Sequence, residues 1–342
     1  MLELHRPDGA FEALEDYLEG FWGRDGLVAD LFLGYGLAES IRRGPQPGPP
    51  EPCQLPLLAC RIRPAEQVGR VSTVGYEVGD WERSWDDEGY ASAIEQVRSA
   101  IARGDVYQAN LVQHMSASFA GDAWALALAL RHLRPLVPRP FTGHGWTVVS
   151  ATPELFLARR GDRLVTMPIK GTRPAGVDVE GEKDGAEHVM IVDLERNDLA
   201  RVCEPGTIAW PELMAQRELA GVTHLVSTVE GRLRPGVGVG EILAATFPGG
   251  SVTGAPKIAA CDLIASLEPV GRGASMGALG VVKPNGDFEL ALTIRTLAVA
   301  EGRIHLWVGG GIVWDSNPED EIEESWVKAR PLLAALGSLV PA

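Results

Sequence analysis

The stretch from residue 151 to residue 172 reads Ala151-Thr152-Pro153-Glu154-Leu155-Phe156-Leu157-Ala158-Arg159-Arg160-Gly161-Asp162-Arg163-Leu164-Val165-Thr166-Met167-Pro168-Ile169-Lys170-Gly171-Thr172. Two short apolar runs, 155–158 and 164–167, flank a turn sequence with Gly161, and this pattern predicts a β-hairpin. The ends of a hairpin lie side by side, so we expect Glu154 and Lys170 to be neighbours in space.

Two interpretations of this pair remain open. An acid that protonates a leaving hydroxyl, beside an amine that attacks carbon, would form a covalent-catalysis pair. Such an amine must lose its proton, and desolvation in a closed site would lower the pKa of Lys170. A weak cross-strand salt bridge between Glu154 and Lys170 would explain the same spacing.

Composition narrows the class of protein. The chain has 342 residues, 45% of them hydrophobic, which is enough for a sizeable core in one or two domains. The formal net charge of −15 argues against a nucleic-acid or anionic-membrane surface, which would need clustered Lys and Arg. We therefore expect small molecules and proteins as partners.

The sequence contains no targeting or membrane signal. Residues 1–5 lack a basic flank before an apolar run, and no stretch approaches the roughly 18 apolar residues that span a bilayer. We expect a cytoplasmic protein with reduced, buried thiols. The cysteines form no C-x-x-C pair, which argues against a zinc or thioredoxin-like site. They are Cys53, Cys60, Cys203 and Cys261.

A strand with one polar face follows the helix expected over 87–103, which Gly104 would end. In this strand, 106–115, the period of two places Gln108, Asn110 and His114 on the same face. This face is either an ordinary solvated sheet face or one wall of a polar pocket.

Further along, a polar loop is expected over 173–182 and a helix over 183–202. The helix is rich in ionisable residues, including Glu187 and His188. These side chains either cover a solvated face or include a ligand that points inward.

The most distinctive loop reads Phe247-Pro248-Gly249-Gly250-Ser251-Val252-Thr253-Gly254-Ala255-Pro256-Lys257. It is not a Walker A motif, because Ala255-Pro256 separates Gly254 from Lys257. It leads into a helix expected over 257–267. Either its free N–H groups face an anionic ligand such as a carboxylate, or it is a tight turn packed against its neighbours.

A three-stranded meander is expected over 277–283, 288–299 and 303–308. Arg295 interrupts the apolar run of the middle strand and would need an anionic partner there. The glycines at 309–311 would allow close approach of a ligand. In the final helix, 319–337, Glu324 and Lys328 lie on one face at i, i+4.

Taken in order, these segments resemble the chorismate-utilising enzymes, which include the large subunits of anthranilate synthase and aminodeoxychorismate synthase, isochorismate synthase and salicylate synthase. The resemblance covers about residues 85–335. It implies an α+β fold in which two antiparallel β-sheets pack together and are flanked by helices, as in anthranilate synthase component I. Residues 1–84 would be a short N-terminal portion of this fold and 85–337 the catalytic core. The motifs that carry the resemblance are 105–111, 168–172, 183–188, 193–199, 224–227, 247–257, 294–296 and 309–313.

The same resemblance implies roles for individual residues. Glu187 and Glu324 would hold Mg²⁺, which binds a carboxylate of chorismate, and Glu154 would protonate the departing C4 hydroxyl. The remaining substrate-binding residues implied are Gln108, Gly171, Thr172, Arg295, Gly309, Gly310 and Lys328.

Two positions indicate the reaction within this family. Gln108 stands where water-using relatives carry a lysine base, so addition of water is disfavoured. Lys170 is typical of the members that aminate chorismate at C4, where it would attack C2 before ammonia enters. The implied product is 4-amino-4-deoxychorismate, a precursor of 4-aminobenzoate and folate. Anthranilate synthase is the alternative.

The expected nitrogen source is ammonia. No cysteine lies in the Gly-flanked strand-to-helix elbow of a class I glutamine amidotransferase, and little length remains outside the core for another catalytic domain. The resemblance therefore implies a separate glutamine amidotransferase subunit that forms a heterodimer with this chain.

Overall fold

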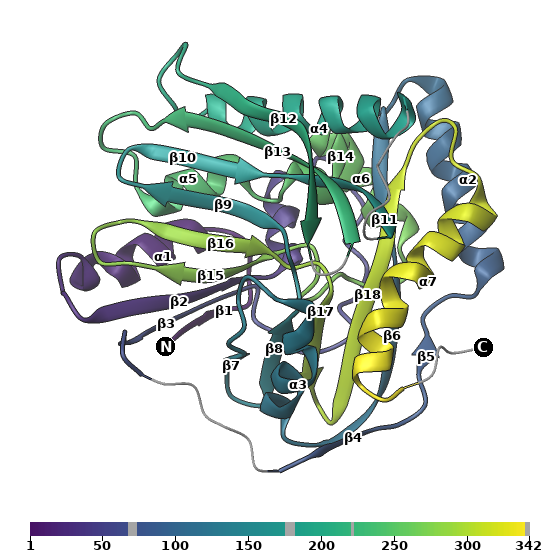
Figure 1. The fold of residues 1–342 in the computed structure, drawn as a ribbon, viewed down its shortest axis with the longest axis horizontal. Helices are drawn as coiled ribbons and strands as arrows, with labels where there is room; N and C mark the ends of the chain where they lie inside the picture. The colour runs from purple at the N-terminus through teal and green to yellow at the C-terminus, as the bar shows by residue number, and fades with distance from the viewer. Residues whose placement is uncertain (68–73, 175–181, 220–221, 339–342) are drawn as a thin grey trace.

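The computed structural model describes residues 1–67, 74–174, 182–219 and 222–338. Within these residues the chain forms two antiparallel sheets, one of ten strands and one of eight (Figure 1). In Figure 1 the strands of the first sheet run across the view, and those of the second run nearly down it. Most of the predicted polar loop, 175–181, lies outside the described residues.

The first sheet contains β1 (Leu2–Leu4), β2 (Leu27–Leu33), β3 (Leu58–Pro64), β9 (Leu155–Arg160), β10 (Arg163–Met167), β11 (Ile169–Pro174), β12 (Ala209–Leu219), β13 (Val222–Arg232), β15 (Ala278–Val282) and β16 (Phe288–Leu292). Their order is β1-β3-β2-β15-β16-β9-β10-β13-β11, and β12 also pairs with β13. Residues 1–84 thus supply three strands of this sheet, with β2 paired to β15.

The second sheet contains β4 (Tyr76–Val78), β5 (Glu82–Arg83), β6 (Gln108–Gly121), β7 (Phe141–Thr142), β8 (Trp146–Ser150), β14 (Gly254–Ala255), β17 (Thr296–Ala300) and β18 (Arg303–Ile312). Their order is β14-β6-β18-β17-β8-β7, and β4 and β5 pair with β6.

The helices are α1 (Ala10–Leu18), α2 (Asp87–Arg103), α3 (Ala123–Leu130), α4 (Glu182–Ala200), α5 (Val239–Thr246), α6 (Lys257–Leu267) and α7 (Pro318–Ala335), with 3₁₀ turns at Glu19–Phe21, Tyr35–Ile41, Arg131–Leu133 and Gly250–Val252. The helices predicted over 87–103 and 257–267 are confirmed. Gly104 ends α2 in the left-handed conformation with φ 80°. No helix among the described residues is long and apolar enough to cross a bilayer.

Three apolar clusters hold these layers together. The largest joins the two sheets to each other and to α1, α4 and α5, because it contains Phe32 of β2, Val148 of β8 and Leu243 of α5. The second cluster packs α3 and α7 against the second sheet, and the third cluster packs α2 and α6 against the same sheet. The predicted α+β fold, two antiparallel sheets packed together and flanked by helices, is confirmed.

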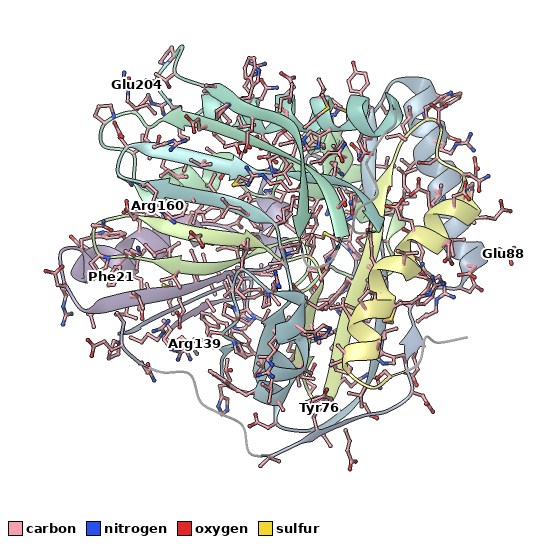
Figure 2. The ribbon with its side chains drawn as sticks, viewed as in Figure 1. Phe21, Tyr76, Glu88, Arg139, Arg160 and Glu204 are labelled. Carbon is pink, nitrogen blue, oxygen red and sulfur yellow. The ribbon has the colours of Figure 1, made fainter. Side chains whose placement is uncertain are left out.

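The predicted hairpin is confirmed as β9 and β10, with Arg163 opposite Arg160. Figure 2 labels Arg160, which ends β9 at the turn. Gly161 follows with φ 63°, a conformation that glycine adopts without strain.

The predicted single strand 288–299 is wrong, because it forms two strands in different sheets. β16 pairs with β9 in the first sheet, whereas β17 pairs with β8 in the second. Arg295 between them has φ 50°, a left-handed conformation that interrupts an extended chain. The expected meander is therefore two hairpins, β15–β16 and β17–β18, one in each sheet.

Candidate active site

A cavity of about 610 Å³ is lined by both sheets and by α4 and α7. It brings together most of the residues that the sequence implicated: Glu154, Lys170, Gly171, Glu187, Arg295, Gly309, Gly310, Glu324 and Lys328. Gln108 contacts this set through Glu187. The backbone of Thr172 belongs to β11.

Glu154 lies directly before β9, and only 4% of it is exposed. Its Oε1 accepts a hydrogen bond of 2.8 Å from Ser251 Oγ and a longer one of 3.5 Å from the Ile169 N–H. Burial raises the pKa of Glu154, although Ser251 and the charge of Lys170 oppose this effect. Because both donors meet Oε1, the proton of the neutral acid belongs on Oε2, where it is available for general acid catalysis.

Lys170 lies on β11, which pairs with β13. Its Nζ is 2.9 Å from Glu187 Oε1 and donates to the Ser251 carbonyl oxygen at 3.4 Å. The ion pair that the structure shows for Lys170 therefore joins it to α4 and not to Glu154. Ser251 lies between the acid and the amine, because its side chain contacts Glu154 and its carbonyl contacts Lys170.

The expectation that burial lowers the pKa of Lys170 is wrong for this arrangement. Burial does act in that direction, but the negative charges of Glu187, Glu154 and Glu324 outweigh it. The pKa of Lys170 therefore ends above its ordinary value. As long as Glu187 remains its ion partner, Lys170 is an ammonium group and not a nucleophile.

Glu187 of α4 points into the cavity, whereas the next residue, His188, is buried and contacts Ser227 Oγ at 2.6 Å. Glu187 Oε1 also accepts a 2.6 Å hydrogen bond from Gln108 Nε2. Burial raises the pKa of Glu187, but Lys170 and Gln108 reverse that effect and bring it below its ordinary value. Glu187 is therefore an anion near neutral pH.

The polar face of β6 is buried and is not a solvated sheet face, and Asn110 of this face lines the cavity. Gln108 is 1% exposed, Asn110 is 7% exposed and lines the cavity, and His114 is 5% exposed. His114 contacts His305 at 3.1 Å and Ser84 at 2.5 Å, so it belongs to a buried polar cluster beside the core.

The glycines of β18 form a wall without side chains. A β-carbon at Gly310 would lie 3.5 Å from Glu324 Oε1, and one at Gly311 would lie 2.9 Å from Glu187 Oε1. Lys328 Nζ is 2.7 Å from Glu324 Oε1 and donates to the Gly309 carbonyl oxygen at 2.7 Å. The carboxylates of α4 and α7 thus approach successive residues of one strand.

The two carboxylates fit an open magnesium site. Mg²⁺ commonly takes one or two protein carboxylates and completes its octahedron with water and substrate oxygens. Glu187 and Glu324 line the same cavity from different helices. Among the described residues no group of three or more His, Cys, Asp or Glu side chains could form a closed metal cage.

Arg295 lies between β16 of the first sheet and β17 of the second, and it places a positive charge in the cavity. Its side chain lines the cavity, and its carbonyl oxygen accepts a 2.9 Å hydrogen bond from the Ala151 N–H. Burial lowers the pKa of Arg295, and the charge of Glu154 opposes this. A guanidinium stays protonated at neutral pH, so the side chain suits a carboxylate ligand.

The loop 247–257 packs against α4, and Ser251 and Val252 of the same loop line the cavity. The Gly250 N–H donates to Glu195 Oε1 at 3.0 Å, and Lys257 pairs with Asp198. Ser251 was not predicted as a site residue, because its signal in the sequence was no more than a hydroxyl residue within a glycine-rich loop.

Comparisons with known proteins agree with this arrangement. The family model described as chorismate binding enzyme matches residues 66–334. Anthranilate synthase component 1 of Thermus thermophilus is 42% identical over 329 residues, 92% of this chain and 66% of the relative. Aminodeoxychorismate synthase component 1 of Klebsiella aerogenes is 38% identical over 273 residues, 75% of this chain and 60% of the relative.

A solved structure, anthranilate synthase component I from Streptococcus pneumoniae TIGR4, superposes with a TM-score of 0.80 and 25% identity. The match covers 94% of this chain and 85% of that one. The chain spans 66% and 60% of the lengths of the two sequence relatives above. From the extent of the family match and these identities, the chain belongs to the chorismate binding enzyme family.

Proposed function

We propose that this chain aminates chorismate at C4 to give 4-amino-4-deoxychorismate, the activity of aminodeoxychorismate synthase component 1. The observation that carries the proposal is the position of Lys170 in the same cavity as the buried acid Glu154, with Ser251 touching both. A lysine and a buried carboxyl group whose pKa is raised by burial, both lining one cavity, suit displacement of a hydroxyl by a covalent route.

In this mechanism the Lys170 amine forms a bond to C2, the ring double bonds shift, and the C4 hydroxyl leaves as water with the proton of Glu154. Ammonia then forms a bond to C4, the bond between Lys170 and C2 breaks, and the proton released by nitrogen returns to Glu154. Arg295 and Lys328 would hold a substrate carboxylate. Mg²⁺ held by Glu187 and Glu324 would supply positive charge for the other carboxylate.

Lys170 begins as an ammonium group paired with Glu187. Loss of that ion pair would lower its pKa, because the charge and hydrogen bond of Glu187 are the main causes that oppose the effect of burial. If Glu187 instead holds Mg²⁺ when substrate binds, the neutral form of the Lys170 amine would be favoured at the stage when it must attack C2.

Anthranilate synthase activity is the second candidate, because the 42% identical Thermus relative carries that name. Product analysis by mass and fluorescence, with chorismate, Mg²⁺ and ammonium, separates the two. We expect the C4-aminated product; anthranilate as the main product would overturn the assignment. A glutamine amidotransferase subunit is the proposed physiological source of ammonia.

A further inference from the structure

Glu195 is a buried carboxyl group of α4 that takes no part in the proposed reaction. Only 4% of it is exposed, and it is not among the residues that line the cavity. It follows Glu187 along the helix by about two turns, so the two side chains project from the same side of α4. A carboxyl group is costly to bury, so a buried one is normally held by specific hydrogen bonds.

The partner of Glu195 is the backbone of the loop 247–257. Its Oε1 accepts a 3.0 Å hydrogen bond from the Gly250 N–H, and Gly250 begins the 3₁₀ turn Gly250–Val252. A β-carbon at Gly250 would lie 2.7 Å from Leu194 Cδ2 and 3.0 Å from Glu195 Oε1, so only glycine lets the turn approach α4 this closely. Glu195 therefore fixes the start of the turn relative to α4.

The far end of the same loop is also attached to α4. Lys257 pairs with Asp198, and its Nζ donates to the Thr246 carbonyl oxygen at 3.1 Å. Asp198 follows Glu195 at i+3, so the two carboxyl groups are neighbours on the helix. One side of α4 thus holds the loop 247–257 at two points.

The residue after Gly250 joins the acid to the amine. Ser251 Oγ donates to Glu154 Oε1 at 2.8 Å, and the Ser251 carbonyl oxygen accepts from Lys170 Nζ at 3.4 Å. Gly250 and Ser251 are adjacent in one tight turn, so a shift of the Gly250 N–H moves both of these contacts. Hydrogen bonds weaken steeply when their distance or angle departs from the usual range.

The acceptor at Glu195 is an uncharged acid near neutral pH. Burial raises the pKa of Glu195 to about 8, the negative charges of Asp198 and Glu154 act in the same direction, and Lys257 opposes them. The uncharged acid keeps a carbonyl oxygen that accepts from the Gly250 N–H. The amide of glutamine offers the same acceptor and cannot ionise.

We propose that Glu195 is a positioning residue, which acts through the Gly250–Val252 turn to hold Ser251 between Glu154 and Lys170. The inference rests on the proposed function only in that Glu154 is the acid for the departing C4 hydroxyl, so it holds for amination at either ring carbon. α4 then has two roles, because it carries Glu187 into the cavity and fixes the loop behind the acid.

Comparing Glu195→Leu with Glu195→Gln tests the acceptor alone, because neither variant can ionise. We expect Glu195→Gln to keep kcat close to that of the wild type. Glu195→Leu should lower kcat roughly three- to tenfold, the value of one hydrogen bond, and leave the KM for chorismate unchanged. The alkaline limb of its pH–kcat profile should lie at higher pH than that of Glu195→Gln, because Glu154 loses the Ser251 hydrogen bond that favours its ionised form.

Further variants separate positioning of Ser251 from support of the fold. In a Ser251→Ala background, Glu195→Leu and Glu195→Gln should give the same alkaline limb, because the hydrogen bond on which Glu195 acts is already absent. Leu199→Val, a change at a fully buried core residue of α4, should lower thermal stability and leave the limb in place. Glu195→Met, with a more flexible side chain, replaces Glu195→Leu if the leucine variant fails to fold.

The outcomes separate the two levels of proposal. Wild-type protein without any turnover of chorismate would defeat the proposed function and this inference together. Anthranilate as the product would defeat C4 amination alone, because the C4 hydroxyl leaves in that reaction too and the Glu195 variants can still be compared. Wild-type turnover with coincident alkaline limbs in Glu195→Leu and Glu195→Gln would overturn the positioning role alone, even if kcat falls.

Discussion

Lys170 Nζ and Glu187 Oε1 form a 2.9 Å ion pair inside the cavity, although one residue lies on a strand and the other on a helix. The proposed nucleophile is thereby paired with a proposed metal ligand. The same contact keeps the amine charged and the carboxylate ionised, so the two functions are linked before any substrate arrives.

Lys170→Ala should abolish the C4-aminated product and leave the chain folded. The amine is the proposed nucleophile, and loss of a positioned reacting group lowers rates by at least about a hundredfold. Turnover with chorismate and ammonium, together with thermal unfolding followed by circular dichroism, checks both parts. Full C4 amination by this variant would remove the covalent step.

Glu324→Gln should raise the Mg²⁺ concentration required for half-maximal activity by at least about tenfold, because a metal ligand is lost. Glu319→Gln is the matched control on the same helix. Glu319 is exposed and is not among the residues that line the cavity, so its loss should leave the Mg²⁺ titration unchanged. Identical titrations for the two variants would contradict the metal assignment.

Ser251→Ala should move the alkaline limb of the pH–kcat profile to higher pH. The Ser251 hydrogen bond favours the ionised form of Glu154, so removing it raises the pKa of that acid further. A general acid works while protonated, and its activity would then persist to higher pH. Ser266→Ala, which removes a hydroxyl bonded within α6, is the control that should leave the profile in place.

Acid should destabilise the fold through the buried histidines. Burial lowers the pKa of His305 to about 4 and that of His114 to about 3. The unfolded chain therefore binds these protons first, and stability is lost as pH falls below about 6.5, by about 2 kcal/mol per histidine between pH 7 and pH 5.

Urea unfolding at pH 7 and pH 5 measures this effect. His305→Gln should lose about 2 kcal/mol less stability than the wild type over that interval. His132→Gln changes an exposed histidine and should behave like the wild type. Equal losses in all three proteins would show that burial does not lower the pKa of His305.

The purified chain should use ammonium and not glutamine. A glutaminase nucleophile must be an accessible thiolate. All four cysteines are buried, and burial raises the pKa of Cys53 and Cys60 to about 12 and that of Cys203 to about 11. Product formed from chorismate and glutamine by this chain alone would contradict the prediction, whereas product formed only after an amidotransferase is added would support it.

Local sequence patterns were sufficient to predict those helices and strands whose turn and capping residues lie close together in the chain. The apolar runs beside Gly161 determined the β9–β10 hairpin, and Gly104 marked the end of α2. The motifs spread from residue 105 to residue 313 were also sufficient to indicate the family. In these cases periodicity and turn chemistry act over a few residues.

Which side chains contact each other across the fold was determined only by the tertiary structure. The spacing of Glu154 and Lys170 suggested a cross-strand pair, but β13 lies between β10 and β11, and Lys170 instead meets Glu187 from α4. The left-handed turn at Arg295, which sends one apolar run into two sheets, has no local signal beyond a charge in that run. Ion pairing and burial join residues far apart in sequence, so the charge state of Lys170 and the contact of Glu195 with the Gly250 N–H could be read only from the packed chain.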